Sequence, residues 1–356
     1  MRILIFALSG IGDALMFTPS IKALRQTYPD AQIDALVMFG GVRDIYERNP
    51  HLSQTLYYDF MKQGALNSLI YLLKLRGKYD ASINVYPANR KEYNIFSFIV
   101  GAKRRVAIDY LRMNSSSLAF LNNLRIKEND SLHNVEENLL LCEKLAGQKF
   151  NATPLLEFYL YKEDELASAE FLSRNKITDD ELVIGFHPGC ATLKNHVRRR
   201  WEPEKFSELG RLLIKEFNAH ILIFGGPEEG ELKQTVACGI NSDRVIITKG
   251  ENLAQSAAIM KRCSLFITND SSLMHAASAL KLRVIAIIGP TNTNYIRPWQ
   301  TNHTIVSLNL ECSPCFFYSP KPLICHRTDV QFKCIKELSV PMVLEAARKM
   351  ILSPSN

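Results

Sequence analysis

The sequence predicts an α/β fold built from two Rossmann-like domains, each with a parallel sheet. Short apolar runs alternate with helical patterns, the arrangement that joins parallel strands through crossover helices. The pattern then restarts in the second half of the 356 residues, a length that suggests two domains of about 150 residues each. The two halves share this architecture without forming a sequence repeat.

The first half opens on an apolar run that ends at Ser9-Gly10, which we interpret as a strand followed by a glycine turn and a helix. Leu15, Ile21 and Leu24 form the expected buried face of that helix. The predicted elements of this half are strands at 2–8, 33–39 and 81–85, helices at 13–27 and 135–145, and a Leu-rich helix ending near Gly77.

The second half restarts after a junction at residues 147–180, where Pro154, a short apolar stretch and charged residues indicate a linker. Its predicted elements are strands at 182–186, 219–224, 244–248, 265–268 and 284–288, and helices at 203–217, 271–280 and 340–352. The predicted domains are residues 1–165, residues 166–335 and a C-terminal helix and tail at 336–356.

Composition is that of an ordinary globular protein, with 47% hydrophobic and 22% charged residues. The formal charge of +7 is a mild bias that fits an anionic substrate or contact with an anionic membrane face, not nucleic acid. No apolar run approaches the ~20 residues that span a bilayer. Gly10, Gly12 and Asp13 interrupt the apolar N-terminus, so we expect a first strand instead of a signal peptide and a cytoplasmic location.

The segment Ser9–Asp13 stands where a strand gives way to a helix. Gly10 and Gly12 allow close approach of a ligand, and a helix N-terminus favours negative charge. No glycine lies three residues after Gly12 and no acidic residue ends the second strand, so a nicotinamide dinucleotide is disfavoured. Asp13 is then either a general base or a helix cap.

Three loops after strands of the second half carry candidate donor-binding residues. Ser271 and Ser272, with their backbone amides, are expected to bind phosphate at a helix start, and Asp270 to cap that helix or bind a hydroxyl. His275 lies one turn further and is either packed or functional. Glu228, after Gly225-Gly226, is expected to accept hydrogen bonds from sugar or ribose hydroxyls, with a surface turn as the alternative.

A basic stretch follows His187-Pro188-Gly189. Thr192 is a candidate hydrogen-bond donor to a phosphate. Residues 194–200 include several cationic side chains, among them Arg199. Such a loop can neutralise a diphosphate through bidentate arginine contacts, and a solvated charged loop is the alternative. In the first half, Lys103, Arg104 and Arg105 form a candidate patch for an anionic acceptor, with a solvated face as its alternative.

Four of the eight cysteines cluster near the C-terminus: Cys312, Cys315, Cys325 and Cys334. Cys312 and Cys315 have zinc-knuckle spacing, and His326 is a further candidate ligand. Reduced thiols in a loop-rich unit are the preferred interpretation, and a structural zinc is the alternative.

With these motifs in place, the chain resembles glycosyltransferase family nine, the ADP-heptose lipopolysaccharide heptosyltransferases and their relatives. The resemblance spans nearly the whole chain. It rests on the order of its motifs: Ile11–Leu15 with Thr18–Ser20, Gly101–Arg105, His187–Gly189, Arg200-Trp201, Gly225–Glu228, Asn269–Ser272 with His275, and Gly289–Thr291.

The resemblance implies a GT-B fold of two facing Rossmann-like domains and an inverting transfer that requires no metal. It places the donor site mainly in the C-terminal domain and the acceptor site mainly in the N-terminal one. It assigns the catalytic aspartate to Asp13, a basic residue that is usually lysine to Arg199, and a nucleotide-binding acid to Glu228. Arginine at 199 and Ser272 in place of the usual glycine leave room for a donor other than ADP-heptose.

The expected function is therefore transfer of a sugar, a heptose from ADP-heptose, onto a lipopolysaccharide-core or related anionic glycolipid. Peripheral contact with the inner face of the membrane is expected from the charge and the resemblance. Two alternatives remain open at this point. One is an enzyme resembling a nucleotide-sugar 2-epimerase, and the other is a non-catalytic nucleotide-binding protein.

Overall fold

The structure is a computed structural model that describes residues 1–151, 154–250, 252–318 and 321–353. Contacts between Cα atoms divide the chain into two compact units. The first contains Met1–Tyr159 and also Tyr318, and the second contains Leu160–Phe317 and the chain from Lys321 onward. The boundary predicted at 165/166 falls inside helix α6, which packs on α9 of the second unit.

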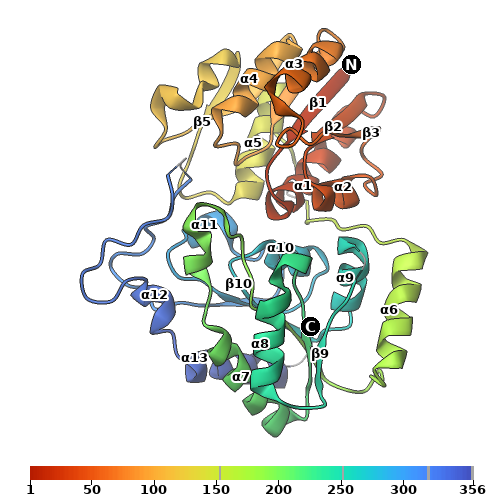
Figure 1. Cartoon of the computed structure of the whole chain (residues 1–356). Coiled ribbons are helices and arrows are strands. Elements are labelled where there is room, and N and C mark those ends of the chain that lie inside the picture. Colours follow the sequence, from red (N-terminus) through yellow and green to blue (C-terminus); the bar gives the residue numbers. More distant parts are fainter. Residues whose placement is uncertain (152–153, 251, 319–320, 354–356) are drawn as a thin grey trace. The chain divides into compact units, whose positions relative to one another are not determined.

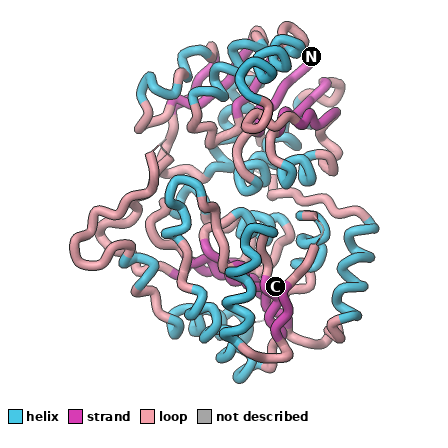
Figure 2. Tube along the Cα trace, in the orientation of Figure 1, coloured by secondary structure: helices cyan, strands magenta, loops and turns pink. Residues whose placement is uncertain are grey.

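The first unit holds a six-stranded sheet of order β3-β2-β1-β4-β5-β6, in which each pair is parallel (Figures 1 and 2). Helix α1 packs on α5, and α3 packs on α4. Its elements are β1 Arg2–Ala7, α1 Ile11–Thr27, β2 Gln32–Val37, α2 Gly40–Tyr46, β3 Gln54–Tyr57, α3 Gly64–Leu75, β4 Ala81–Asn84, α4 Lys91–Val100, β5 Arg104–Asp109, β6 Leu124–Lys127 and α5 Asn134–Ala146.

The second unit repeats this order as β12-β11-β10-β7-β8-β9, again all parallel. Helix α7 packs on α8 and α13, and α9 packs on α6 and α10. Its elements are α6 Lys162–Arg174, β7 Val183–His187, α7 Pro203–Phe217, β8 His220–Ile223, α8 Gly230–Ile240, β9 Val245–Ile247, α9 Leu253–Met260, β10 Leu265–Asn269, α10 Ser272–Ala279, β11 Val284–Ile287, α11 Thr293–Ile296, β12 His303–Val306, α12 Lys333–Lys336 and α13 Val340–Leu352.

Central strands are buried on both faces because helices cover both sides of a parallel sheet. In β1 only Arg2 is exposed, and all residues of β7 and β10 are buried. Continuous apolar runs of this kind made these strands readable from sequence, and the prediction of two Rossmann-like parallel sheets is confirmed. Among the described residues, no helix is long and apolar enough to cross a membrane.

Four strands were missed: β3, β5, β6 and β12. Three of them are sheet edges, and residues of β3, β6 and β12 are only partly buried, so they lack a continuous apolar run. Strand β5 begins with Arg104 and Arg105, which the sequence analysis took for a surface patch. An edge strand is less buried than a central strand and therefore needs fewer apolar residues. Its sequence gives a correspondingly weaker signal for a strand.

Candidate functional site

The loop after β1 is held by hydrogen bonds from several elements of the first unit. Gly10 is the N-cap of α1, and its N–H donates to Asp13 Oδ2 at 3.1 Å. The Ser9 hydroxyl donates to the carbonyl of Pro87 at 2.6 Å, and the Tyr93 hydroxyl donates to that of Leu8 at 2.7 Å. Asp13 therefore caps α1 through one carboxylate oxygen. Since a carboxylate has two acceptor oxygens, the cap is compatible with a second role.

Three buried tyrosines lie within electrostatic reach of Asp13. Burial raises the pKa of Tyr46 and Tyr110 well above the ordinary value, and the charge of Asp13 raises both further. Burial also raises the pKa of Tyr93 to about 12; nearby Arg90 lowers it and Asp13 raises it. These phenols are therefore neutral at physiological pH and add no charge near the half-buried Asp13.

The predicted acceptor patch is not brought together with Asp13. Arg104 is in register with Ala81, and Ala81 with Ile3, so this segment lies where the strands begin. Asp13 follows the opposite end of β1, roughly 15 Å or more along the strand direction at about 3.3 Å per residue. A substrate hydroxyl at Asp13 would therefore be far from Lys103.

The two arginines of that patch also have structural partners. Arg104 donates to the carbonyl of Leu145, and Arg105 donates to those of Ala102 at 2.7 Å and Leu121 at 3.1 Å. Both side chains thereby tie loop carbonyls to the start of β5. Nothing in this placement supports an acceptor-binding role for Lys103, Arg104 and Arg105, and their arginines have a structural explanation.

In the second unit, a chain of buried side chains joins the ends of three strands. His187 Nδ1 lies 2.8 Å from Ser271 Oγ, and His187 Nε2 lies 3.0 Å from Glu229 Oε2. His187, Glu229 and Ser271 are exposed by only 3%, 7% and 7%. Because an ionised carboxylate only accepts, the Nε2–H of His187 donates to Glu229, and Nδ1 is left to pair with the Ser271 hydroxyl, which also lies 3.0 Å from Thr268 Oγ1.

Glu229 is embedded in a cradle of donors. Its carboxylate accepts from Gly226 N–H at 3.1 Å and from Arg200 Nη2 at 3.3 Å, in addition to His187. Burial alone would raise the pKa of Glu229, but the bond to His187 and the charges and donors around it lower that pKa below the ordinary value. Glu229 is therefore an anion at neutral pH, and it fixes both His187 and Arg200.

Gly189 leaves room for this cradle, and replacing it with alanine should destabilise the protein. A Cβ at position 189 would lie 1.7 Å from Glu229 Oε1, so the carboxylate or the loop must move. Overpacking of this kind costs about 1–3 kcal/mol, which thermal unfolding measures. Gly230→Ala is the matched control, because a Cβ there meets no atom within 4 Å. Equal melting temperatures for the two variants would contradict the prediction.

Arg199 and Asp270 form a buried ion pair at the same sheet edge. Arg199 Nη1 lies 2.5 Å from Asp270 Oδ2, and each side chain is 9% exposed. The Thr291 hydroxyl donates to the same Asp270 oxygen at 2.6 Å, and the Arg199 guanidinium lies 5.3 Å from the centre of the Phe316 ring. The structure thus brings Arg199 to the Asp270–Ser271 turn, which begins 71 residues further along the chain.

The two histidines beside this pair are neutral at physiological pH. Burial, together with the charge of Arg199, lowers the pKa of His196 to about 4. Burial likewise lowers the pKa of His275 to about 4, while Asp270 opposes the shift. Neither histidine therefore adds positive charge beside Arg199.

Several buried donors in this region have no hydrogen-bond partner among the described residues. They are Arg199 Nε, Arg200 Nε, His196 Nε2 and His275 Nδ1. Buried polar atoms are nearly always paired in folded proteins, and exceptions call for an explanation such as a water or a ligand. Their gathering around one ion pair marks this edge as a candidate anion site.

The remaining predicted donor-site residues, and Gly12 in the first unit, also follow the carboxyl ends of strands. Ser271 is the N-cap of α10 and Ser272 its first residue, while Thr192 and Glu228 are exposed. Gly12 lies in the first turn of α1. Sequence reasoning named Glu228 where the structure buries its neighbour Glu229, and it treated His187 only as a turn. A carboxylate on each of two adjacent loop residues gives no sequence signal for which one turns inward.

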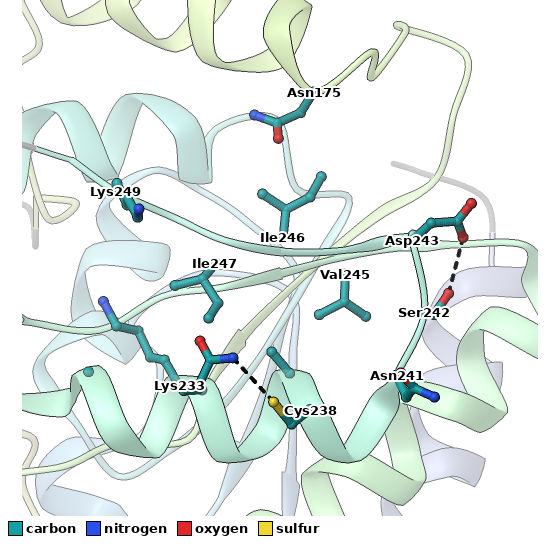
Figure 3. A pocket seen from close by; sticks show the side chains of 13 residues that line it. Asn175, Lys233, Cys238, Asn241, Ser242, Asp243, Val245, Ile246, Ile247 and Lys249 are labelled. Atoms are coloured by element: carbon teal, nitrogen blue, oxygen red, sulfur yellow. Dashed lines mark hydrogen bonds between the residues drawn. The ribbon is translucent and has the colours of Figure 1, made fainter.

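A groove of about 900 Å³ runs along the edge strand β9 and α8. Figure 3 shows Lys233 and Lys249 at one end of it and Asp243 at the other. Lys233 Nζ donates to the carbonyl of Gly225 at 3.0 Å, so the lysine end adjoins the glycine turn before Glu229. Lys249, which begins a loop that the family resemblance places near the nucleotide base, is part of its lining, whereas the candidate catalytic, phosphate-binding and acceptor-binding residues are not.

The four clustered cysteines are all free thiols. Burial raises the pKa of the Cys334 thiol to about 11, and its three neighbours Cys315, Cys325 and Cys312 raise it further, so the thiols lie near one another. Within the described parts of the chain, no group of three or more His, Cys, Asp or Glu is arranged to hold a metal ion. A zinc at Cys312, Cys315, Cys325 and Cys334 stays a prediction to which this geometry adds no support.

Comparison with known proteins agrees with the folds of both units. The model of "Glycosyltransferase family 9 (heptosyltransferase)" matches residues 73–322. Lipooligosaccharide heptosyltransferase 2 of Campylobacter jejuni is 25% identical over 99% of this chain and 98% of its own length. The enzyme of the same name from Haemophilus ducreyi is 29% identical over 86% of this chain and 89% of its own.

A solved structure shows the same fold across the chain. The structure of Escherichia coli ADP-heptose LPS heptosyltransferase II aligns with a TM-score of 0.75 and 19% identity, covering 99% of each chain. With the two Rossmann-like sheets, this is the α/β architecture of the GT-B fold. From the family match, which covers well over half of its length, the chain belongs to glycosyltransferase family 9 and is a glycosyltransferase.

Proposed function

We propose that this glycosyltransferase transfers a heptose from ADP-heptose to a lipopolysaccharide-core or related anionic glycolipid, with inversion at the anomeric carbon. The names of its relatives support the substrate class. The observation that carries the proposal is the anion site built around Arg199 and Ser271. It combines a buried arginine, a helix N-terminus and buried polar nitrogens that have no hydrogen-bond partner in the described parts of the chain.

The donor diphosphate is bound, in this proposal, at the start of α10. The backbone N–H groups of Ser271 and Ser272 and the positive end of the helix dipole face an anion there, and Arg199 adds a full charge. Asp270 orients the Arg199 guanidinium, since it accepts one of its N–H bonds and leaves others for the ligand. Glu228 and Thr192 contribute polar contacts at the rim of this site, and His275 supplies a neutral nitrogen near it.

His187 and Glu229 fix the Ser271 side chain in this scheme. The Ser271 hydroxyl is paired with His187, whose other nitrogen donates to Glu229. These bonds fix the side chain at the start of α10, beside the backbone amides proposed to bind the phosphate. His187 and Glu229 are positioning residues that act through Ser271, which itself contacts the donor.

The chemical step transfers one glycosyl group. Asp13 accepts the proton of the acceptor hydroxyl, and that oxygen forms a bond to the anomeric carbon from the face opposite the nucleotide. The bond between the anomeric carbon and the phosphate oxygen breaks, and ADP leaves with the electron pair. Arg199, the helix dipole and the Ser271 and Ser272 amides stabilise the negative charge that develops on the diphosphate.

On the acceptor side, Arg90 is better placed than residues 103–105. It follows β4, and its charge lowers the pKa of Tyr93, whose hydroxyl binds the loop beside Asp13. An anionic glycolipid acceptor would be consistent with this cation and with the net charge of +7. In this proposal, the transfer of the sugar to such an acceptor takes place at the cytoplasmic face of a membrane.

The donor prediction is tested by thermal unfolding with nucleotides. ADP at a hundredfold excess over its dissociation constant should stabilise the protein by about 2.7 kcal/mol, since ligands that bind only the folded state shift the equilibrium by mass action. UDP and GDP at the same concentration are the controls. Stabilisation by UDP but not by ADP would contradict ADP-heptose as donor while leaving the anion site intact.

Turnover distinguishes a transferase from the alternatives. Purified protein with ADP-heptose and a heptose-deficient core acceptor should release ADP and form a glycosylated product of inverted configuration. Donor alone should stay intact. Consumption of a nucleotide-sugar without acceptor would instead indicate a 2-epimerase-like enzyme, and binding without any turnover would indicate a nucleotide-binding protein.

A further inference from the structure

Helix α3 carries large aliphatic side chains on an exposed face as well as on its buried one. Its buried face carries Ser68, Leu72 and Leu75. On the other face, Leu66, Leu69, Ile70 and Leu73 are exposed by 71%, 41%, 45% and 47%. The outward face of a surface helix is ordinarily polar, so four large aliphatic side chains there do not match exposure to water alone.

The exposed aliphatic residues form one continuous stripe. Positions 66, 69, 70 and 73 follow the i, i+3, i+4, i+7 spacing that places side chains on a single helix face. Met61, just before the helix, is a further exposed apolar residue at 60%. Contiguous apolar patches on a soluble protein mark interaction sites, whereas single exposed leucines need no explanation.

Basic residues surround this stripe. Between residues 61 and 78 the sequence has four cations, Lys62, Lys74, Arg76 and Lys78, and no acidic residue. All four are exposed. Lys62 pairs with Asp59 at 3.6 Å, whereas Lys74 and Lys78 have no ion pair with any described residue. The surface thus combines an aliphatic stripe with positive charge.

We propose that the exposed face of α3 docks the enzyme on an anionic lipid surface. Leu66, Leu69, Ile70 and Leu73 would enter the boundary between headgroups and acyl chains, and Lys74 and Lys78 would bind the headgroup phosphates. The purpose of docking rests on the proposed function, because a lipid-anchored acceptor is presented at such a surface. The docking itself is measured without substrate.

Composition favours lipid over a protein partner. Energetic centres of protein interfaces are enriched in Trp, Tyr and Arg and depleted in Lys, and leucine is under-represented among them. The α3 face has aliphatic side chains with flanking lysines instead. Leucine-rich faces with lysines on the polar side are typical of helices that lie in the membrane interface.

The experiment is flotation of the full-length protein with vesicles. Wild-type protein should float with vesicles that contain phosphatidylglycerol, several-fold less with phosphatidylcholine alone, and less at high salt, because headgroup attraction is screened. Leu69→Glu/Leu73→Glu should lower the partition coefficient at least tenfold. Lys74→Glu/Lys78→Glu should lower it by a similar factor on anionic vesicles only.

Leu166→Glu/Leu352→Glu is the matched control, since it places the same two charges on exposed leucines of the second unit, 60% and 75% accessible. It should float like wild type. Failure of the wild-type protein to float on anionic vesicles would overturn the proposal, as would equal flotation of Leu69→Glu/Leu73→Glu. A dimer in sedimentation that only this variant loses would assign the stripe to self-association and overturn it too.

Failure of docking and failure of the proposed function give different results. Asp13→Asn should float like wild type while losing turnover. Leu69→Glu/Leu73→Glu should keep wild-type turnover on a soluble, delipidated acceptor and lose it only on a vesicle-bound one. Loss of turnover on both acceptors would mean that the variant affects the enzyme itself and would overturn the docking interpretation.

Discussion

Replacing Asp13 with asparagine should reduce turnover by about 10²- to 10⁴-fold, the contribution of a general base, while ADP still binds. The substitution preserves the structural role, because an amide oxygen can accept the hydrogen bond that Gly10 N–H now donates to Asp13 Oδ2. What asparagine lacks is the ability to take a proton. The measurement is kcat with ADP-heptose and acceptor, alongside ADP affinity by calorimetry.

A second aspartate in the chain provides the control for capping. Asp164 occupies the third position of α6, and it accepts from the N–H of Tyr161 at 2.9 Å, much as Asp13 accepts from Gly10. Asp164→Asn should therefore leave turnover unchanged. Turnover of Asp13→Asn within a few-fold of wild type would remove Asp13 from the chemistry and leave only the cap.

Replacing Arg199 with methionine should lower kcat/KM for the donor by about 10²- to 10³-fold, the loss expected when one preorganised group that stabilises transition-state charge is removed. Arg199→Lys, which restores the residue usual in the family, should recover much of the activity because it keeps the charge. Arg198→Met is the control, since Arg198 is the exposed neighbour. An effect of equal size at Arg198 would show that only the general basic charge of the loop matters.

The Arg199→Met variant is also expected to be less stable, and a second substitution separates this loss of stability from the loss of activity. Arg199→Met leaves the Asp270 carboxylate buried without its cation, which costs about 3–5 kcal/mol. The double variant Arg199→Met/Asp270→Asn removes that uncompensated charge and should regain most of the melting temperature. Its activity should nevertheless stay low. Recovery of turnover together with stability would show that Arg199 has a structural role only.

The central strands of both sheets could be predicted from sequence because their signal is local. β1, β7 and β10 are buried on both faces, so each is a continuous apolar run that ends in glycine, proline or a polar turn. The helices α7 and α13, predicted at 203–217 and 340–352, have the bounds expected. Edge strands β3, β6 and β12 pair on one side only, and their partly buried sequences were not distinguishable from loops.

The candidate site was likewise predictable from sequence only where the signal is local. The sequence by itself placed Asp13, Arg199 and the Asp270–Ser272 turn at strand ends, because a parallel sheet gathers those ends at one edge whatever the side chains do. The order of the motifs along the chain also predicted the family whose model matches residues 73–322. These inferences depend only on residue type and position in the chain.

Only the tertiary structure decided which of those side chains meet. It paired Arg199 with Asp270, 71 residues apart, turned Glu229 inward instead of Glu228, and joined His187 to Ser271 across 84 residues. It also placed Lys103–Arg105 where the strands of the first sheet begin, away from Asp13, which follows the end of β1. It left an apolar face of α3 exposed to solvent. Contacts and exposure of this kind depend on the packing of segments distant in sequence, so no local pattern of residues encodes them.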